Sequence, residues 1–170
     1  AEDGLKDAIW AADLLKVVRE DVHLLVLGDG RERWRWVRFR DDVQIQDRVH
    51  FLSDPVDPLR RIAGLDGYWA VGRTRRLGWG LLYALRAGVP IVATASGEQR
   101  SWFQRLEEPC LIDVGDRAGL ARATLRILED PDYATRLGNA GQEQLAAWRS
   151  AQPEPAEIVR GMIEACSVCT

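Results

Sequence analysis

Cysteine, lysine and long apolar runs are all scarce in this sequence of 170 residues. Its 3 cysteines are too few and too unevenly spaced for the disulfide framework of a small secreted domain, and no signal-peptide pattern precedes them. Lys6 and Lys16 are the only lysines, so arginine supplies nearly all the positive charge. No window approaches the roughly 20 apolar residues of a membrane span. These absences predict a cytoplasmic protein with no membrane span.

The net charge argues against a protein that mainly binds nucleic-acid phosphates. The sequence has 23 Lys and Arg and 26 Asp and Glu, so the net charge is −3. Residues 31–40 do alternate arginine with aromatic residues, a pattern typical of surfaces that stack bases. Helical spacing offers the stronger interpretation, in which Trp36 and Phe39 pack inward while Arg35 and Arg38 face solvent. We therefore do not expect nucleic acid as a partner, although this run leaves it as a minor alternative.

Apolar runs and apolar spacing predict an alternation of strands and helices. The run at residues 22–27 is continuous, which is typical of a strand buried on both faces. The predicted strands are residues 22–27, 49–52, 68–71, 91–93 and 110–112. The predicted helices are residues 5–15, 36–43, 58–62, 81–86, 120–128, 133–148 and 158–163.

This alternation predicts an α/β fold, a doubly wound and mostly parallel sheet with helices on both faces. One domain is expected, since 170 residues fit a single core. Ligands of such sheets bind at the carboxyl ends of the strands, so the loops after Leu27, Leu52, Val71 and Ala93 are the places to search for a site.

The loop between Gly72 and Gly80 is the strongest candidate. Gly78 and Gly80 would let a ligand approach the backbone, and the free N–H groups at the start of the next helix favour an anion. Arg73 and Arg75 add positive charge. Neither the dinucleotide fingerprint nor the Walker loop is present. The loop predicts a diphosphate cradle, with an ordinary glycine-punctuated turn as the alternative.

An ordered set of segments resembles the C-terminal, nucleotide-sugar-binding half of the group 1 (family 4) glycosyltransferases, which have the two-domain GT-B fold. No single segment is specific, but their order and spacing are. The segments are Val26-Leu27-Gly28-Asp29-Gly30, Arg48-Val49-His50-Phe51-Leu52, Arg73-Thr74, Leu77-Gly78, Leu81-Leu82, Ala87-Gly88-Val89-Pro90-Ile91-Val92-Ala93-Thr94, Gly97, Leu128-Glu129-Asp130-Pro131 and Arg136-Leu137-Gly138.

The resemblance implies a Rossmann-like nucleotide-sugar-binding domain over residues 1–150, with residues 151–170 as its C-terminal helix and tail. It also implies sugar transfer with retention of configuration, with the nucleotide sugar as a substrate and with no cofactor and no bound metal. The first strand of this domain and the N-terminal acceptor-binding domain of the family are absent from the sequence. An N-terminal acceptor-binding domain is therefore an expected partner.

Two positions depart from the family pattern, because Arg75 and Tyr83 stand where a pair of glutamates is usual. A tyrosine cannot offer the bidentate carboxylate that would grip ribose hydroxyls. The sequence therefore leaves two functions open: the donor-binding domain of an active glycosyltransferase, or a catalytically degenerate domain with a binding or regulatory role.

The loop and the resemblance together predict the contacts of a nucleotide sugar, while no catalytic residue is assigned. His23 and His50 lie in apolar strands and are expected to be structural. The predicted contact residues are Gly28, Gly30, Phe51, Arg73, Arg75, Gly78, Trp79, Gly80, Leu81, Leu82, Tyr83 and Gly97.

Overall fold

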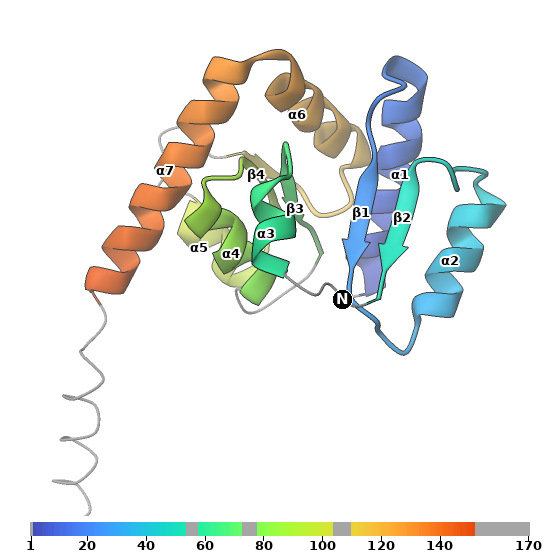
Figure 1. Ribbon diagram of the computed structural model, residues 1–170, viewed down its shortest axis with the longest axis horizontal. Helices are drawn as coiled ribbons and strands as arrows, with labels where there is room; N and C mark the ends of the chain where they lie inside the picture. Colours follow the sequence, from blue (N-terminus) through green and yellow to red (C-terminus); the bar gives the residue numbers. More distant parts are fainter. Residues whose placement is uncertain (1, 54–57, 73–77, 104–109, 152–170) are drawn as a thin grey trace, which may run out of the picture.

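A computed structural model describes residues 2–53, 58–72, 78–103 and 110–151. Helices and strands alternate along the chain (Figure 1). The strands are β1 (Leu24–Leu27), β2 (Val49–Leu52), β3 (Tyr68–Ala70), β4 (Ile91–Thr94) and β5 (Leu111–Ile112). The helices are α1 (Glu2–Val18), α2 (Arg33–Asp42), α3 (Pro58–Ala63), α4 (Trp79–Ala87), α5 (Gly97–Phe103), α6 (Arg117–Glu129) and α7 (Pro131–Ser150).

Every described strand pairing is parallel, which confirms the predicted α/β class, but the strands form two sheets rather than one. In the first sheet β1 pairs with β2, with Leu24 opposite Val49. In the second the order is β3-β4-β5, with Tyr68 opposite Ile91. A region without strand pairing among the described residues therefore separates β1 from β3.

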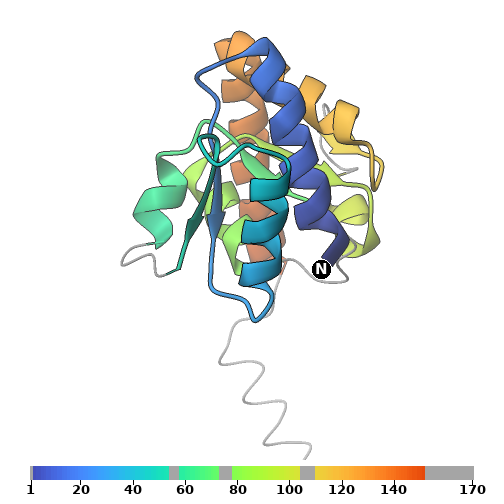
Figure 2. The ribbon, with the colours of Figure 1, turned by 90° about the vertical axis from the view of Figure 1, so that its right-hand side faces the viewer.

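The core lies on both faces of β4, whose four residues are all buried. Successive side chains of a strand point to opposite faces. Ile91 and Ala93 accordingly pack with residues of α3, α4, α5 and α7, while Val92 packs with residues of α1, α6 and α7. Helices thus cover the second sheet from both sides (Figures 1 and 2).

Glycine and aspartate fix the ends of the helices around this core. The Asp130 carboxylate accepts a hydrogen bond from the Tyr133 N–H at 2.8 Å and so caps α7. Gly88 ends α4 with a φ of +72°, a conformation that glycine adopts without strain. Gly138 of α7 lies against the Gly88 carbonyl with no room for a side chain, and Gln142 Nε2 donates to the Arg86 carbonyl at 3.1 Å. The C-terminal end of α4 is therefore held by α7.

Two sequence predictions differ from the structure. β1 is not buried on both faces: Leu25 is 38% exposed, because β1 has a strand neighbour on one edge only among the described residues. α5 was not predicted, and it begins at Gly97, which the sequence suggested was a loop residue. Polar residues dominate α5, but Gln99 and Phe103 are buried and hold it against the sheet. The helix expected at residues 158–163 lies outside the described residues.

Candidate functional site

The carboxyl ends of β1, β3 and β4 each lead into a glycine with positive φ, namely Gly28 (+122°), Gly72 (+111°) and Gly97 (+52°). L side chains rarely adopt this conformation, so these glycines permit sharp turns at the edge where ligands of parallel sheets bind. A side chain at Gly28 or Gly30 would meet no atom within 4 Å. The loop after β1 is therefore open to a ligand.

Helix α4 is the first helix after β3 and begins at Trp79. Gly78 caps it with extended backbone and makes no side-chain cap hydrogen bond, and the Leu82 N–H returns to the Gly78 carbonyl at 3.2 Å. The N–H groups of Trp79, Gly80 and Leu81 consequently have no carbonyl acceptor within the helix. N–H groups that lack an acceptor within the helix and the positive end of the helix dipole favour an anion at this point.

The two glycines of this turn have different roles. A side chain at Gly78 would meet nothing within 4 Å, as expected of a backbone that a ligand can approach. At Gly80 an added Cβ would lie 2.5 Å from the Tyr68 hydroxyl, so this glycine is needed for packing α4 on β3. Burial also raises the pKa of the Tyr68 phenol above its ordinary value. The sequence prediction had given ligand approach as the reason for both glycines.

The remaining predicted residues of α4 are divided between core and surface. Leu81 is buried, so it can contact a ligand through its backbone alone, while Leu82 is partly buried and packs against the same core. Trp79 is 76% exposed, and its ring lies 6.5 Å from the ring of Tyr83, which is half-buried. Trp79 and Tyr83 thus form an aromatic pair on the helix. Arg73 and Arg75, the two predicted cations, lie outside the described residues.

Two hydroxyl groups tie the loops after β3 and β4 together. Thr94 Oγ1 and Ser96 Oγ both donate to the Gly72 carbonyl, at 2.9 and 2.8 Å. The shared acceptor fixes the position of the chain just before residues 73–77. The sequence prediction did not identify this pair, although hydroxyl residues at the carboxyl end of an apolar strand were a usable signal.

Phe51, one of the predicted contacts of the nucleotide sugar, has two arginines near its ring. The guanidinium carbons of Arg33 and Arg40 lie 6.0 and 5.7 Å from its ring. Arg33 also donates to the Phe51 carbonyl at 3.2 Å and to the Ser53 hydroxyl. The sequence prediction placed Arg33 only in the alternating run of arginine and aromatic residues. It sits where β2 ends and is a positioning residue for this corner.

The alternating arginine and aromatic residues of α2 have the burial that helical spacing predicted: Trp36 is buried and Arg38 is exposed. His23 Nδ1 and His50 Nε2 are 3.1 Å apart, near the amino ends of β1 and β2 and thus at the opposite edge from the loops described above.

The part of the chain that the structure describes contains no cluster of three or more His, Cys, Asp or Glu side chains arranged to hold a metal ion. Within the same part, no helix is long and apolar enough to cross a membrane.

Comparisons with known proteins agree with this geometry. Residues 1–130 match the family model for glycosyl transferases group 1. The lipopolysaccharide core biosynthesis glycosyltransferase LpsE of Rhizobium meliloti (strain 1021) is 34% identical over 125 residues, which cover 73% of this chain and 36% of LpsE. The chain therefore spans about a third of the length of this relative.

Solved structures share the fold at low identity. S. aureus TarM, in a complex that includes UDP, superposes with a TM-score of 0.80 at 14% identity, over 95% of this chain and 32% of TarM. The C-terminal domain of the Francisella tularensis group 1 glycosyl transferase LpcC gives a TM-score of 0.73 at 15% identity, over 88% of this chain and 81% of that domain. The chain belongs to the group 1 glycosyl transferases and has the α/β fold of a GT-B domain.

Proposed function

We propose that this chain is the donor-binding domain of a glycosyltransferase that moves a sugar from a nucleotide sugar to an acceptor. The observation that carries the proposal is the N-terminus of α4, where Gly78 makes no side-chain cap hydrogen bond, in a chain whose strands β1, β3 and β4 are each followed by a glycine with positive φ. A UDP complex of the structural neighbour TarM supports a nucleoside diphosphate as the ligand class.

In this proposal the diphosphate rests on the N–H groups of residues 79–81, with Arg73 or Arg75 neutralising its charge. The base lies near Phe51 and Ser53, a corner whose shape Arg33 maintains. Gly28 and Gly30 leave room for the sugar and ribose, and Gly97 is a further contact in the turn after β4. The chemistry is then donor positioning and stabilisation of the leaving diphosphate. The nucleotide sugar is a substrate, and no resident cofactor or metal is proposed.

In this proposal an N-terminal acceptor-binding domain completes the cleft, because the donor-binding domain alone does not bind the acceptor. A cytoplasmic location and transfer with retention of configuration remain predictions. The alternative, a catalytically degenerate domain with a binding or regulatory role, rests on Arg75 and Tyr83, which stand where the family usually has glutamates. The relatives named above are glycosyltransferases, which favours the donor-binding function over a purely regulatory one.

Isothermal titration with the diphosphates of uridine, guanosine and adenosine tests the proposal on protein first shown to be folded by circular dichroism. We expect one of them to bind, and the corresponding monophosphate to bind at least about tenfold more weakly, because hydrogen bonds to charged groups contribute about 1.5–3 kcal/mol. Arg73→Ala should weaken diphosphate binding by a similar factor.

Arg122→Ala is the matched control, since Arg122 is an exposed arginine of α6 whose described ion pair is with Asp116. It should leave diphosphate affinity unchanged. Folded protein that gives no heat with any of the three diphosphates would refute the proposal. Equal loss of affinity in Arg73→Ala and Arg122→Ala would show that general charge, rather than a diphosphate seat, drives binding.

A further inference from the structure

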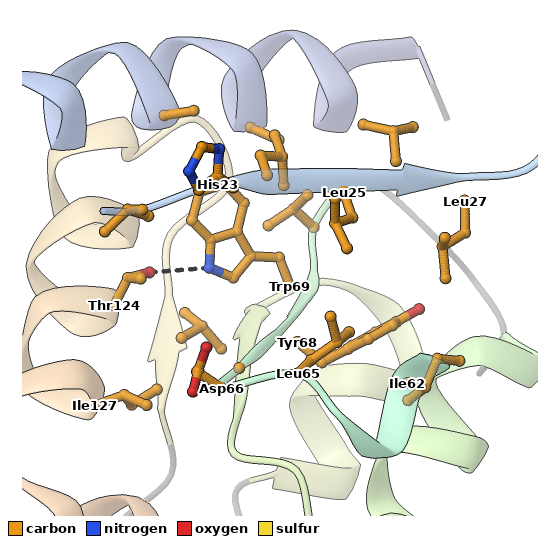
Figure 3. Close-up of a pocket in the computed structure, with 18 of the residues that line it drawn as sticks. His23, Leu25, Leu27, Ile62, Leu65, Asp66, Tyr68, Trp69, Thr124 and Ile127 are labelled. Carbon is orange, nitrogen blue, oxygen red and sulfur yellow. Dashed lines mark hydrogen bonds between the residues drawn. The ribbon is translucent and has the colours of Figure 1, made fainter. Parts of the chain in front are cut away.

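The only two histidines of the sequence face each other on the first sheet. His23 Nδ1 lies 3.1 Å from His50 Nε2, and the ring centroids are 5.3 Å apart, so ring nitrogens and not ring faces meet. Figure 3 shows His23 where β1 begins, at the other end of the strand from Leu27. The pair is therefore at the amino edge of the sheet, away from the loops that carry the proposed diphosphate seat.

The register of β1 and β2 brings the two rings to the same face of the sheet. Leu25 is opposite His50 in the parallel ladder, and His23 precedes Leu25 by two residues. Residues two apart along a strand share a face, and so do paired residues of neighbouring strands. Leu24 and Val49, which are also opposite each other, point to the other face and pack with residues of α1 and α2. The main-chain ladder thus holds the pair in place.

Solvent can reach both imidazoles. His23 is exposed and His50 is half-buried, and His23 lines a cavity beside β1 together with Arg19 and Asp21. A hydrogen bond between two such groups contributes little to stability, because water competes for both of them. The hydrogen bond of the pair can therefore give way to a ligand that binds both nitrogens more strongly.

The charged groups around the pair nearly balance. Arg19 Nε and Nη2 donate to the Asp21 carboxylate, and Arg48 Nε lies 3.1 Å from Asp47 Oδ2. Two arginines without partners would repel a bound cation, but here each guanidinium has a carboxylate beside it. Because Arg19 engages the Asp21 carboxylate, the site is assigned two protein ligands, the two imidazoles.

We propose that His23 Nδ1 and His50 Nε2 together bind one divalent transition-metal ion, with water in its remaining coordination positions. Neutral imidazole nitrogens suit copper, nickel and zinc, whereas magnesium and calcium take oxygen ligands. Metal–nitrogen bonds of about 2.0–2.1 Å at angles of about 90–110° place two nitrogens about 2.8–3.4 Å apart. The observed separation of 3.1 Å lies within that range. The ion takes no part in the proposed sugar transfer, and the inference does not depend on that function.

The ion replaces the hydrogen bond of the pair without a net loss of protons. In the unbound pair one facing nitrogen carries the hydrogen and the other accepts it. When the ion binds, that hydrogen leaves to solvent and the second nitrogen of the same ring takes one up, so both rings stay neutral. Both facing nitrogens then present lone pairs, and the rings turn so that these lone pairs converge on the ion. The bound ion links β1 to β2.

Titration calorimetry with Cu²⁺, Ni²⁺, Zn²⁺ and Mg²⁺ tests the proposal in a chain with Cys166→Ser and Cys169→Ser, because thiolates also bind transition metals. We expect one ion per chain, with Cu²⁺ the tightest of the four and no heat with Mg²⁺. His23→Asn and His50→Asn should each weaken Cu²⁺ binding at least about tenfold, because each removes one of two ligands. The double variant should add little to either single loss, since the two imidazoles act as one site.

Glu20→Gln, which removes an exposed carboxylate from the turn before β1, is the control and should leave Cu²⁺ affinity unchanged. Electron paramagnetic resonance of the Cu²⁺ complex should show two bound imidazole nitrogens before substitution and one in each single variant.

Three outcomes would overturn the proposal. Two ions per chain, each lost with one histidine, would show independent sites. Cu²⁺ affinity that survives in the double variant would place the ion elsewhere. A spectrum of the chain with both histidines that lacks a pair of bound nitrogens would exclude the site even if a variant failed to fold. None of these measurements involves a nucleotide, so failure here is distinct from failure of the proposed function.

Discussion

β4 and β1 are both short apolar strands, yet their environments differ. β4 has a strand on each side and helices on both faces, and each of its four residues is buried. β1 has one strand neighbour in the described part of the chain, and Leu25 is 38% exposed. An apolar run therefore predicts that a strand forms, whereas the burial of that strand depends on which other segments reach its edges.

The largest expected effect comes from truncating a side chain of β4, the strand that has a neighbour on each side. Ile91 is 3% exposed, and truncation of such a residue leaves a cavity that costs about 2–5 kcal/mol. Ile91→Ala should lower the free energy of unfolding by that amount in guanidinium titrations. Leu25→Ala, the matched change in β1, should cost about 1 kcal/mol or less, since little apolar area leaves a buried site.

Equal losses in Ile91→Ala and Leu25→Ala would contradict the comparison between the two strands.

A smaller effect is expected where α4 packs on β3. Gly80→Ala places a Cβ against the Tyr68 hydroxyl, and overpacking of this kind costs about 1–3 kcal/mol. Tyr68→Phe removes the hydroxyl, so the double variant should regain most of the lost stability in a double-mutant cycle. Gly78→Ala, with open space at its Cβ, is the control. Additive losses in the double variant would show that Gly80 is required for another reason.

The smallest effect is expected in the turn that leads into β1. Arg19 Nε and Nη2 donate to the Asp21 carboxylate, and this hydrogen bonding lowers the pKa of Asp21 below its ordinary value. The stabilisation is present above the ordinary carboxyl pKa of about 3.9 and is lost as the pH falls through the lower pKa of the folded state. Asp21 is exposed to solvent, so the effect is small.

Asp21→Asn should therefore lower the urea midpoint slightly at pH 6, and the difference from the unmodified chain should shrink as the pH falls below about 4. Glu20→Gln is the control for loss of one nearby exposed carboxylate. A difference that persists unchanged at low pH would show that the substitution acts through the turn conformation and not through the ion pair.

Apolar runs and apolar spacing were enough to predict the strands and most helices, because continuous apolar runs and apolar residues three and four positions apart report directly on burial. α5 was missed because most of its residues are polar, and a mostly polar helix gives a weak pattern even though Gln99 and Phe103 are buried and Trp102 packs against the core. The break between β1 and β3 could not be read from either strand, since strand pairing is a long-range property.

The candidate site shows the same limit. Glycines at the ends of strands and the start of α4 were recognisable, because turn geometry is local. Arg33, Thr94 and Ser96 were not, because their roles come from contacts with Phe51, Ser53 and Gly72, which lie between 18 and 24 residues away in the sequence. Whether Arg73 and Arg75 contact a diphosphate stays a prediction.

The close approach of Gly138 to Gly88 has a mechanical consequence for α4. With its last turn pressed against the α7 backbone and Gln142 bonded to the Arg86 carbonyl, α4 cannot slide along its axis without dislodging α7. An anion that binds at the N-terminal end of α4 would therefore contact a helix whose position is fixed. Any conformational change on binding would then occur in the neighbouring loops, and α4 would keep its position against α7.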